Sequence, residues 1–143
     1  MEKILEILEY QYPGVSKFLE EFKDKLKIEK IKKKIIVYFE DEVILMLNPR
    51  FGLFVPSKKF SDILFKIGKY IKVKKNDLEF IKQSKNIYKI NVEEFSKNLY
   101  AFEDFALVIE NKIIGVGRAK ISYDEFLKSK RGLVAVVKKF FDI

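Results

Sequence analysis

The sequence predicts an α+β protein in two parts, a small N-terminal α/β domain followed by a partly open β-barrel with short helices. Apolar residues recur at helical spacing up to residue 26, residues 27–31 alternate at period two, and most later segments are short apolar runs between turn residues. A helix in the middle of the chain ends at Gly68, a residue type that favours helix ends. We therefore expect an α/β domain at 1–68 and the barrel at 69–143.

The N-terminal domain is expected to begin with two helices. Residues 3–10 carry one apolar face, and Pro13 suits the first turn of a second helix that continues to residue 26. Ser57 caps the helix that ends at Gly68. Between these helices we expect strands at 27–31, 35–39, 43–47 and 53–55, with a turn at 40–42. The basic run at 30–34 is typical of an edge strand protected by lysine.

The second domain is expected to be mostly strand. Asn76 is the expected cap of a short helix at 77–83, and Ser122 with Glu125 forms a capping-box pattern that opens another at 122–129. The expected strands lie at 70–73, 87–92, 105–110, 113–121 and 133–140. Several short strands with two small helices favour a barrel, whose closure hides most sheet edges.

Composition excludes several kinds of active site. The chain of 143 residues has 48% apolar residues, enough for a packed core, but neither cysteine nor histidine. Thiol nucleophiles, disulfides and imidazole bases are therefore excluded. Neighbouring carboxylates such as Glu93 and Glu94 point to opposite faces of a strand, so we interpret them as surface charge and not as an acid–base pair. We expect no catalytic residue, no metal site and no cofactor.

The net charge of +8 is placed unevenly. Residues 69–143 contain 16 lysines and arginines against 10 acidic residues, a net of +6, so this half is the better candidate for binding a polyanion. The alternative is a thermophile surface, on which lysines serve solubility and ion pairing. The longest apolar run is too short to cross a bilayer, so we expect a cytoplasmic protein without a membrane partner.

Two glycines interrupt the apolar strand at 113–119, where Gly115 and Gly117 precede Arg118. Glycine weakens a strand unless something approaches its backbone closely, and an arginine beside that point suits an RNA phosphate or base. In the alternative interpretation the glycines relieve crowding at a barrel bend, and Arg118 pairs with a nearby carboxylate. Lys120 follows as a further candidate contact.

Residues 69–143 resemble a PUA domain, a small RNA-binding fold. The resemblance rests on the basic first strand, the helix that runs into Phe80-Ile81-Lys82-Gln83-Ser84-Lys85, the strand pair at 106–109 and 113–119, and the closing Lys130-Arg131-Gly132-Leu133-Val134-Ala135-Val136. Ser84 and Asn91 depart from the family, which usually has glycine at both positions.

The PUA resemblance implies an RNA groove. It implies that Lys82, Lys85 and Lys89 form one wall of this groove. It also implies that Lys130 and Arg131 lie on a loop beside the acceptor end of the RNA. The alternatives are a solvated face for the three lysines and, for the loop, cations that the preceding helix dipole favours.

The first domain contains Tyr10-Gln11-Tyr12, the helix to Leu26, the Lys/Ile strand and the run Asn48-Pro49-Arg50-Phe51-Gly52-Leu53-Phe54-Val55-Pro56-Ser57. On these features residues 10–56 resemble the α/β domain that precedes PUA in archaeosine tRNA-guanine transglycosylase. The whole chain thus resembles the C-terminal portion of that archaeal enzyme without its catalytic barrel. The resemblance implies binding to the acceptor stem of tRNA, in support of a base modification such as archaeosine formation by a separate catalytic subunit. The alternatives are a ribosome-biogenesis or translation factor that binds rRNA, and a protein-interaction subunit that has lost RNA binding.

Overall fold

The computed structural model describes residues 6, 9–11, 14–15, 23–31, 34–48 and 53–141. The chain divides into two compact units, Met1–Ile63 and Leu64–Ile143, and the division falls within helix α3 (Lys58–Lys66). The helices expected at 3–10 and 13–26 lie mostly outside the described residues. The domain boundary after Gly68 stays a prediction.

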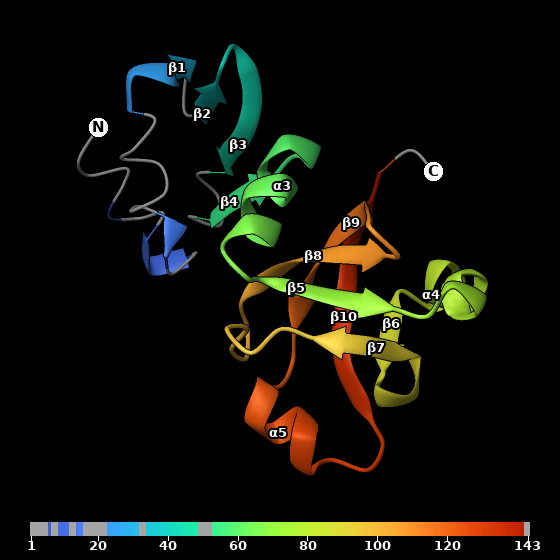
Figure 1. The fold of residues 1–143 in the computed structure, drawn as a ribbon. Helices are drawn as coiled ribbons and strands as arrows, with labels where there is room; N and C mark the ends of the chain where they lie inside the picture. Colours follow the sequence, from blue (N-terminus) through green and yellow to red (C-terminus); the bar gives the residue numbers. More distant parts are fainter. Residues whose placement is uncertain are drawn as a thin grey trace. The chain divides into compact units, whose positions relative to one another are not determined.

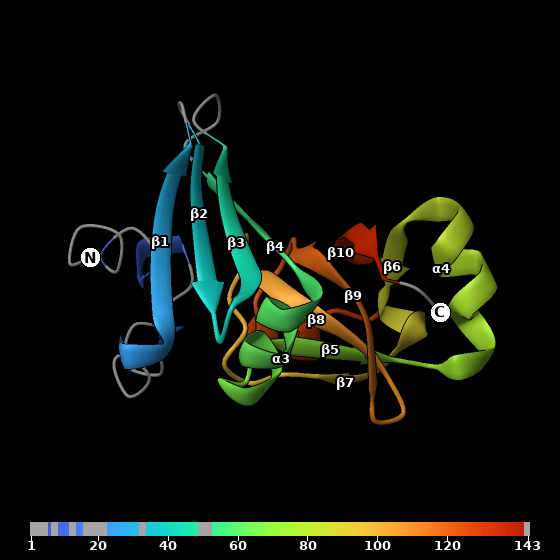
Figure 2. The same ribbon diagram turned by 90° about the horizontal axis from the view of Figure 1, so that it is seen from above.

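The first unit contains an antiparallel meander of four strands in the order β1-β2-β3-β4 (Figure 2). The expected strands agree with it to within one residue at each end. Leu26 pairs with Phe39 and Val37 pairs with Leu45, and all four are buried, so the meander has one apolar face. The edge strand carries exposed Lys27 and Lys30, in keeping with a lysine-protected edge. The elements are the 3₁₀ turn η1 (Lys23–Lys25), β1 (Leu26–Ile31), β2 (Lys34–Phe39), β3 (Glu42–Asn48), β4 (Leu53–Pro56) and α3.

The second unit is built on one curled sheet of six strands in the order β6-β10-β9-β8-β5-β7 (Figure 1). Only the pairing of β5 with β8 is parallel among the described strands. The end strands β6 and β7 are separated in sequence by the three residues of η3 (Lys89–Asn91), so the sheet curls into a partly open barrel. The strands are β5 (Tyr70–Val73), β6 (Asn86–Tyr88), β7 (Val92–Phe95), β8 (Asp104–Ile109), β9 (Lys112–Ala119) and β10 (Leu133–Phe140).

Two short helices flank this barrel, α4 (Leu78–Ser84) and α5 (Tyr123–Lys128). The backbone N–H of Glu125 donates to Ser122 Oγ at 3.3 Å, which confirms the predicted cap of α5. The cap expected at Asn76 is wrong, because Asn76 lies inside the 3₁₀ turn η2 (Lys75–Asp77) that precedes α4. Together with the barrel, these helices confirm the predicted α+β class.

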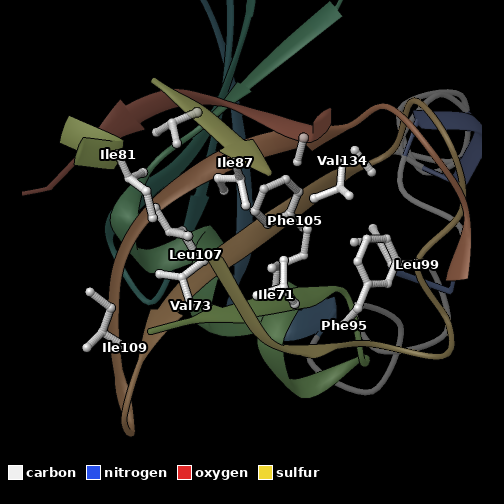
Figure 3. Close-up of a cluster of buried hydrophobic side chains, with 14 of the residues drawn as sticks. Ile71, Val73, Ile81, Ile87, Phe95, Leu99, Phe105, Leu107, Ile109 and Val134 are labelled. Atoms are coloured by element: carbon white, nitrogen blue, oxygen red, sulfur yellow. The ribbon is translucent and has the colours of Figure 1, made fainter. Parts of the chain in front are cut away.

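The core of the barrel surrounds Phe105, which has no exposed surface (Figure 3). Ile71 and Val73 reach it from β5, Leu107 follows on β8, and Val134 lies on β10. Alternate residues of β5 and β8 supply these side chains, as expected for strands with one face toward a core. The core therefore fixes which face of β9 and β10 lies outside the barrel.

The strand expected at 87–92 is wrong, since the chain breaks into β6, η3 and β7. Buried Asn91 explains the break. Its Oδ1 accepts from the backbone N–H of Tyr88 at 2.9 Å, and its Nδ2 donates to Asp77 Oδ2 at 3.2 Å. An asparagine that bonds to nearby backbone in this way competes with the strand ladder.

Candidate nucleic-acid interface

One row of side chains crosses the outer face of four strands in the second unit. The strand registers pair Asn86 with Val136, Val136 with Arg118, and Arg118 with Asp104. Residues directly opposite one another in an antiparallel ladder point to the same face, whereas Gly117, one position away, points to the other. The row therefore presents Arg118 outside the barrel.

Gly115 and Gly117 are buried. At each of them, atoms of the same domain already occupy the space in which a side chain would lie. A Cβ on Gly115 would lie 2.5 Å from the Lys139 carbonyl oxygen. A Cβ on Gly117 would lie 2.6 Å from Phe105 Cζ and closer still to the Val136 carbonyl oxygen. The geometry supports the interpretation that the glycines relieve crowding inside the barrel. A direct contact of either glycine with RNA stays a prediction.

Arg118 pairs with a buried carboxylate, as the alternative interpretation expects. Its Nε lies 3.3 Å from Asp104 Oδ1, and Lys138 Nζ lies 3.4 Å from both carboxylate oxygens of Asp104. The Asp104 side chain is 2% exposed, while those of Arg118 and Lys138 are 32% and 31% exposed. Asp104 thus neutralises one of two cations at the surface, and the cluster retains one net positive charge.

We expect Asp104→Asn to destabilise the protein by about 1–2 kcal/mol, because two partly buried cations lose their shared charge-assisted acceptor. Urea denaturation of the full chain measures this change. Glu93→Gln, which neutralises an exposed carboxylate on β7, is the matched control and is expected to leave the midpoint unchanged. Equal effects of the two substitutions would contradict a structural role for Asp104.

A pocket of about 600 Å³ lies where η3 meets the loop from α5 to β10. Lys130 and Arg131 are exposed, and Ile90 is 74% exposed. The backbone N–H of Lys89 donates to the Gly132 carbonyl at 2.9 Å and joins the two walls. The structure therefore brings Lys89, Lys130 and Arg131 together beside apolar surface. The pocket is lined by Tyr88, Lys89, Ile90, Lys130, Arg131 and Gly132.

Lys82 lies on α4 and Lys85 at its end, and neither of them lines the pocket. Lys85 caps α4 in a left-handed conformation with φ 58°, and its carbonyl accepts from the Val137 N–H at 2.8 Å. Its exposed side chain thus starts beside β10. The Phe80 ring of α4 lies 6.0 Å from the ring of Tyr88, which lines the pocket.

Lys120 and Lys89, the remaining two predicted RNA contacts, differ in whether the protein already engages the ammonium group. Lys120 is exposed just after β9 and does not line the pocket. Lys89 Nζ donates to the carbonyls of Phe126 and Ser129, so its ammonium is already engaged by the protein. Neither Lys120 nor Lys89 is paired with a carboxylate in the ion pairs of the described residues.

Sequence reasoning missed the apolar part of this surface, Phe80, Tyr88 and Ile90. Phe80 is 47% exposed and Ile90 74% exposed. The available signal was that Phe80 and Tyr88 each lie within two residues of a predicted lysine contact, since surfaces that bind single-stranded RNA combine aromatic and basic side chains.

Metal-binding and membrane-spanning features are absent from the described parts of the chain. Residues 6, 9–11, 14–15, 23–31, 34–48 and 53–141 contain no acidic cluster of three or more that could hold a metal ion. No helix within these ranges has the length and apolar character needed to cross a bilayer.

Comparison of the sequence with known proteins gives one weak match and no matching family model. The chain is 22% identical over 99 residues to the archaeosine synthase subunit alpha of Thermoplasma acidophilum. The match covers 69% of this chain and 19% of that protein, so the chain spans about a fifth of its relative. The relative is a synthase subunit, whereas the resemblance expected from the sequence was to the transglycosylase.

Solved structures establish the fold. A conserved PUA domain protein from Thermoplasma acidophilum has a TM-score of 0.63 at 14% identity, over 88% of this chain and 87% of that one. A hypothetical protein from Pyrococcus horikoshii has a TM-score of 0.68 at 12% identity, over 97% and 88%. An H/ACA RNP bound to a substrate RNA has a TM-score of 0.52 at 14% identity, over 66% and 29%. The predicted resemblance is confirmed: the chain has the fold of PUA domain proteins.

Proposed function

We propose that the chain binds RNA through the surface formed by β6, η3 and the loop from α5 to β10. The observation that carries the proposal is the pocket in which exposed Lys130 and Arg131 face the apolar wall of Tyr88 and Ile90. Cations hold phosphates, and an aromatic or apolar wall accepts the face of an unpaired base. This combination favours single-stranded or end regions of RNA over the deep groove of an RNA duplex.

The surroundings of the pocket extend the same chemistry. The Phe80 ring on α4 lies 6.0 Å from the Tyr88 ring of the pocket wall, and Lys85 is exposed at the end of the same helix. Arg118 with Lys138 adds one net positive charge on the outer sheet face. The net charge of +6 on residues 69–143 would attract a polyanion before any contact forms. Phosphate contacts would then dominate affinity, and the pocket would select the unpaired element.

Within this function we propose tRNA as the RNA, held at its acceptor stem, with the chain positioning it for a separate catalytic subunit. The support is the sequence similarity to an archaeosine synthase subunit and the resemblance of residues 10–56 to a domain that precedes PUA in an archaeosine enzyme. The role proposed for this chain is positioning rather than catalysis: the sequence has neither cysteine nor histidine, and no cluster of the described residues could hold a metal ion.

A second candidate is rRNA binding in ribosome assembly or translation. The similarity of the fold to an H/ACA RNP bound to a substrate RNA favours RNA binding without distinguishing tRNA from rRNA. Sequencing of RNA that is crosslinked to the protein in cells separates the two, because enrichment of tRNA supports the first and enrichment of rRNA the second.

We expect the full chain to bind a tRNA transcript with an affinity that falls steeply as salt rises. Each neutralised phosphate contributes about −0.7 to −0.9 to the log–log slope, so three contacts give a slope of about −2. Fluorescence anisotropy between low and moderate salt measures it. A tRNA that lacks its single-stranded 3′ end is the control and should bind more weakly. Absence of binding at low salt, or a flat salt dependence, would contradict the proposal.

A further inference from the structure

Lys89 lies in the RNA surface, but its ammonium is directed toward the protein. Lys89 Nζ donates to the Phe126 carbonyl at 2.5 Å and to the Ser129 carbonyl, and it lies 4.7 Å from the centroid of the Phe126 ring. Phe126 in turn stacks on buried Phe95 at 4.8 Å. The side chain is thus held by three contacts at the C-terminal end of α5.

The backbone of Lys89 makes a further contact with the loop from α5 to β10, since its N–H donates to the Gly132 carbonyl. Between these attachment points lie Lys130 and Arg131, and Ser129 Oγ donates to the Arg131 carbonyl at 3.1 Å. Helix α5 has six residues, too few to be stable alone, and the last carbonyls of a helix need outside donors. Lys89 supplies two of those donor contacts from a distant part of the chain.

We propose that Lys89 is a positioning residue, which fixes the loop that presents Lys130 and Arg131, and that it does not itself bind a phosphate. The proposal rests on the proposed RNA-binding function for its ligand, and on the hydrogen bonds of Lys89 for its mechanism. Two of the three ammonium donors are engaged by the Phe126 and Ser129 carbonyls, and the ammonium also lies over the Phe126 ring. Turning the ammonium fully toward a phosphate would give up these contacts and leave both carbonyls without this donor.

The first test needs no RNA. Lys89→Met keeps the aliphatic stem and removes the donor, so we expect amide hydrogen exchange at residues 123–132 to quicken by about tenfold or more while the sheet stays protected. Lys112→Met, which removes an exposed lysine at the β8–β9 turn, is the control and should change nothing there. Lys89→Arg, with a fork that can reach both carbonyls, should restore protection. Unchanged exchange in Lys89→Met would overturn the proposal.

The second test is a double-mutant cycle on the full chain with a tRNA transcript at low salt. Lys89→Met should weaken binding by about fivefold in the wild-type background and by less than about twofold when Lys130 and Arg131 are already alanine. A similar loss in both backgrounds would mean an independent phosphate contact and would overturn the proposal. If the wild-type protein binds no RNA, the proposed function fails, and the exchange experiment still decides the role of Lys89.

A third measurement uses the wild-type protein, in case the methionine variant does not fold. The ¹⁵N resonances of lysine ammonium groups report their hydrogen bonds, and that of Lys89 should be visible and protected because two carbonyls accept from it. Titration with tRNA should shift the backbone amide resonances of Lys130 and Arg131 and leave the ammonium resonance of Lys89 in place. A Lys89 resonance that shifts together with Lys130 would overturn the proposal.

Discussion

Gly117→Val is expected to destabilise the protein by about 3 kcal/mol, at the upper end of the cost of overpacking a core. A Cβ at this position would lie 2.6 Å from Phe105 Cζ and closer to the Val136 carbonyl oxygen, which belongs to the neighbouring strand. A flexible side chain could move away, but Val136 is held in the β9–β10 ladder and Phe105 fills the barrel core. Urea denaturation of the full chain measures the loss.

Lys112→Val is the matched control, since it places the same β-branched residue on β9 at an exposed position. We expect the urea midpoint of Lys112→Val to stay close to that of the wild-type protein. The test also separates the two interpretations of the glycine. If Gly117→Val keeps the wild-type stability and loses RNA affinity, the glycine faces RNA and the packing explanation is wrong.

Short apolar or alternating runs between turn residues were sufficient to predict most strands of both units, because such runs are typical of strands regardless of what they pair with. The exception at 87–92 shows what such runs omit. Ile87 and Val92 are both buried, but Asn91 between them bonds to the Tyr88 backbone and to Asp77, 14 residues away. A side chain that replaces a ladder bond leaves no periodic signal in the sequence.

The candidate site was predictable in its charges and not in its geometry. Lys130 and Arg131 could be found from the resemblance, and the structure places them side by side on one pocket wall. The partners of Lys89 are carbonyls 37 and 40 residues away, and Arg118 pairs with an aspartate 14 residues away. Such pairings depend on how α5 and β8 fold back, so sequence patterns near each residue could not distinguish a free cation from an engaged one.

Reversing both charges of the pocket loop, with Lys130→Glu and Arg131→Glu together, is expected to weaken tRNA binding by about 100-fold at low salt. Both side chains are exposed and carry no ion pair among the described residues, so the substitutions remove cations available to phosphate. The log–log salt slope should also become shallower by about 0.7–0.9 for each phosphate that the variant no longer neutralises. Anisotropy titrations of the full chain at several salt concentrations measure both changes.

The control variant has the same net charge as the pocket variant, but its two substitutions lie elsewhere in the second unit. Lys97→Glu with Lys112→Glu alters two exposed lysines, one in the loop between β7 and β8 and one at the start of β9. A general electrostatic attraction would make the two double variants equally weak, because each lowers the net charge by the same amount. A localised site predicts that the pocket variant loses far more affinity than the control. Equal losses would contradict the placement of the RNA surface between η3 and the α5–β10 loop.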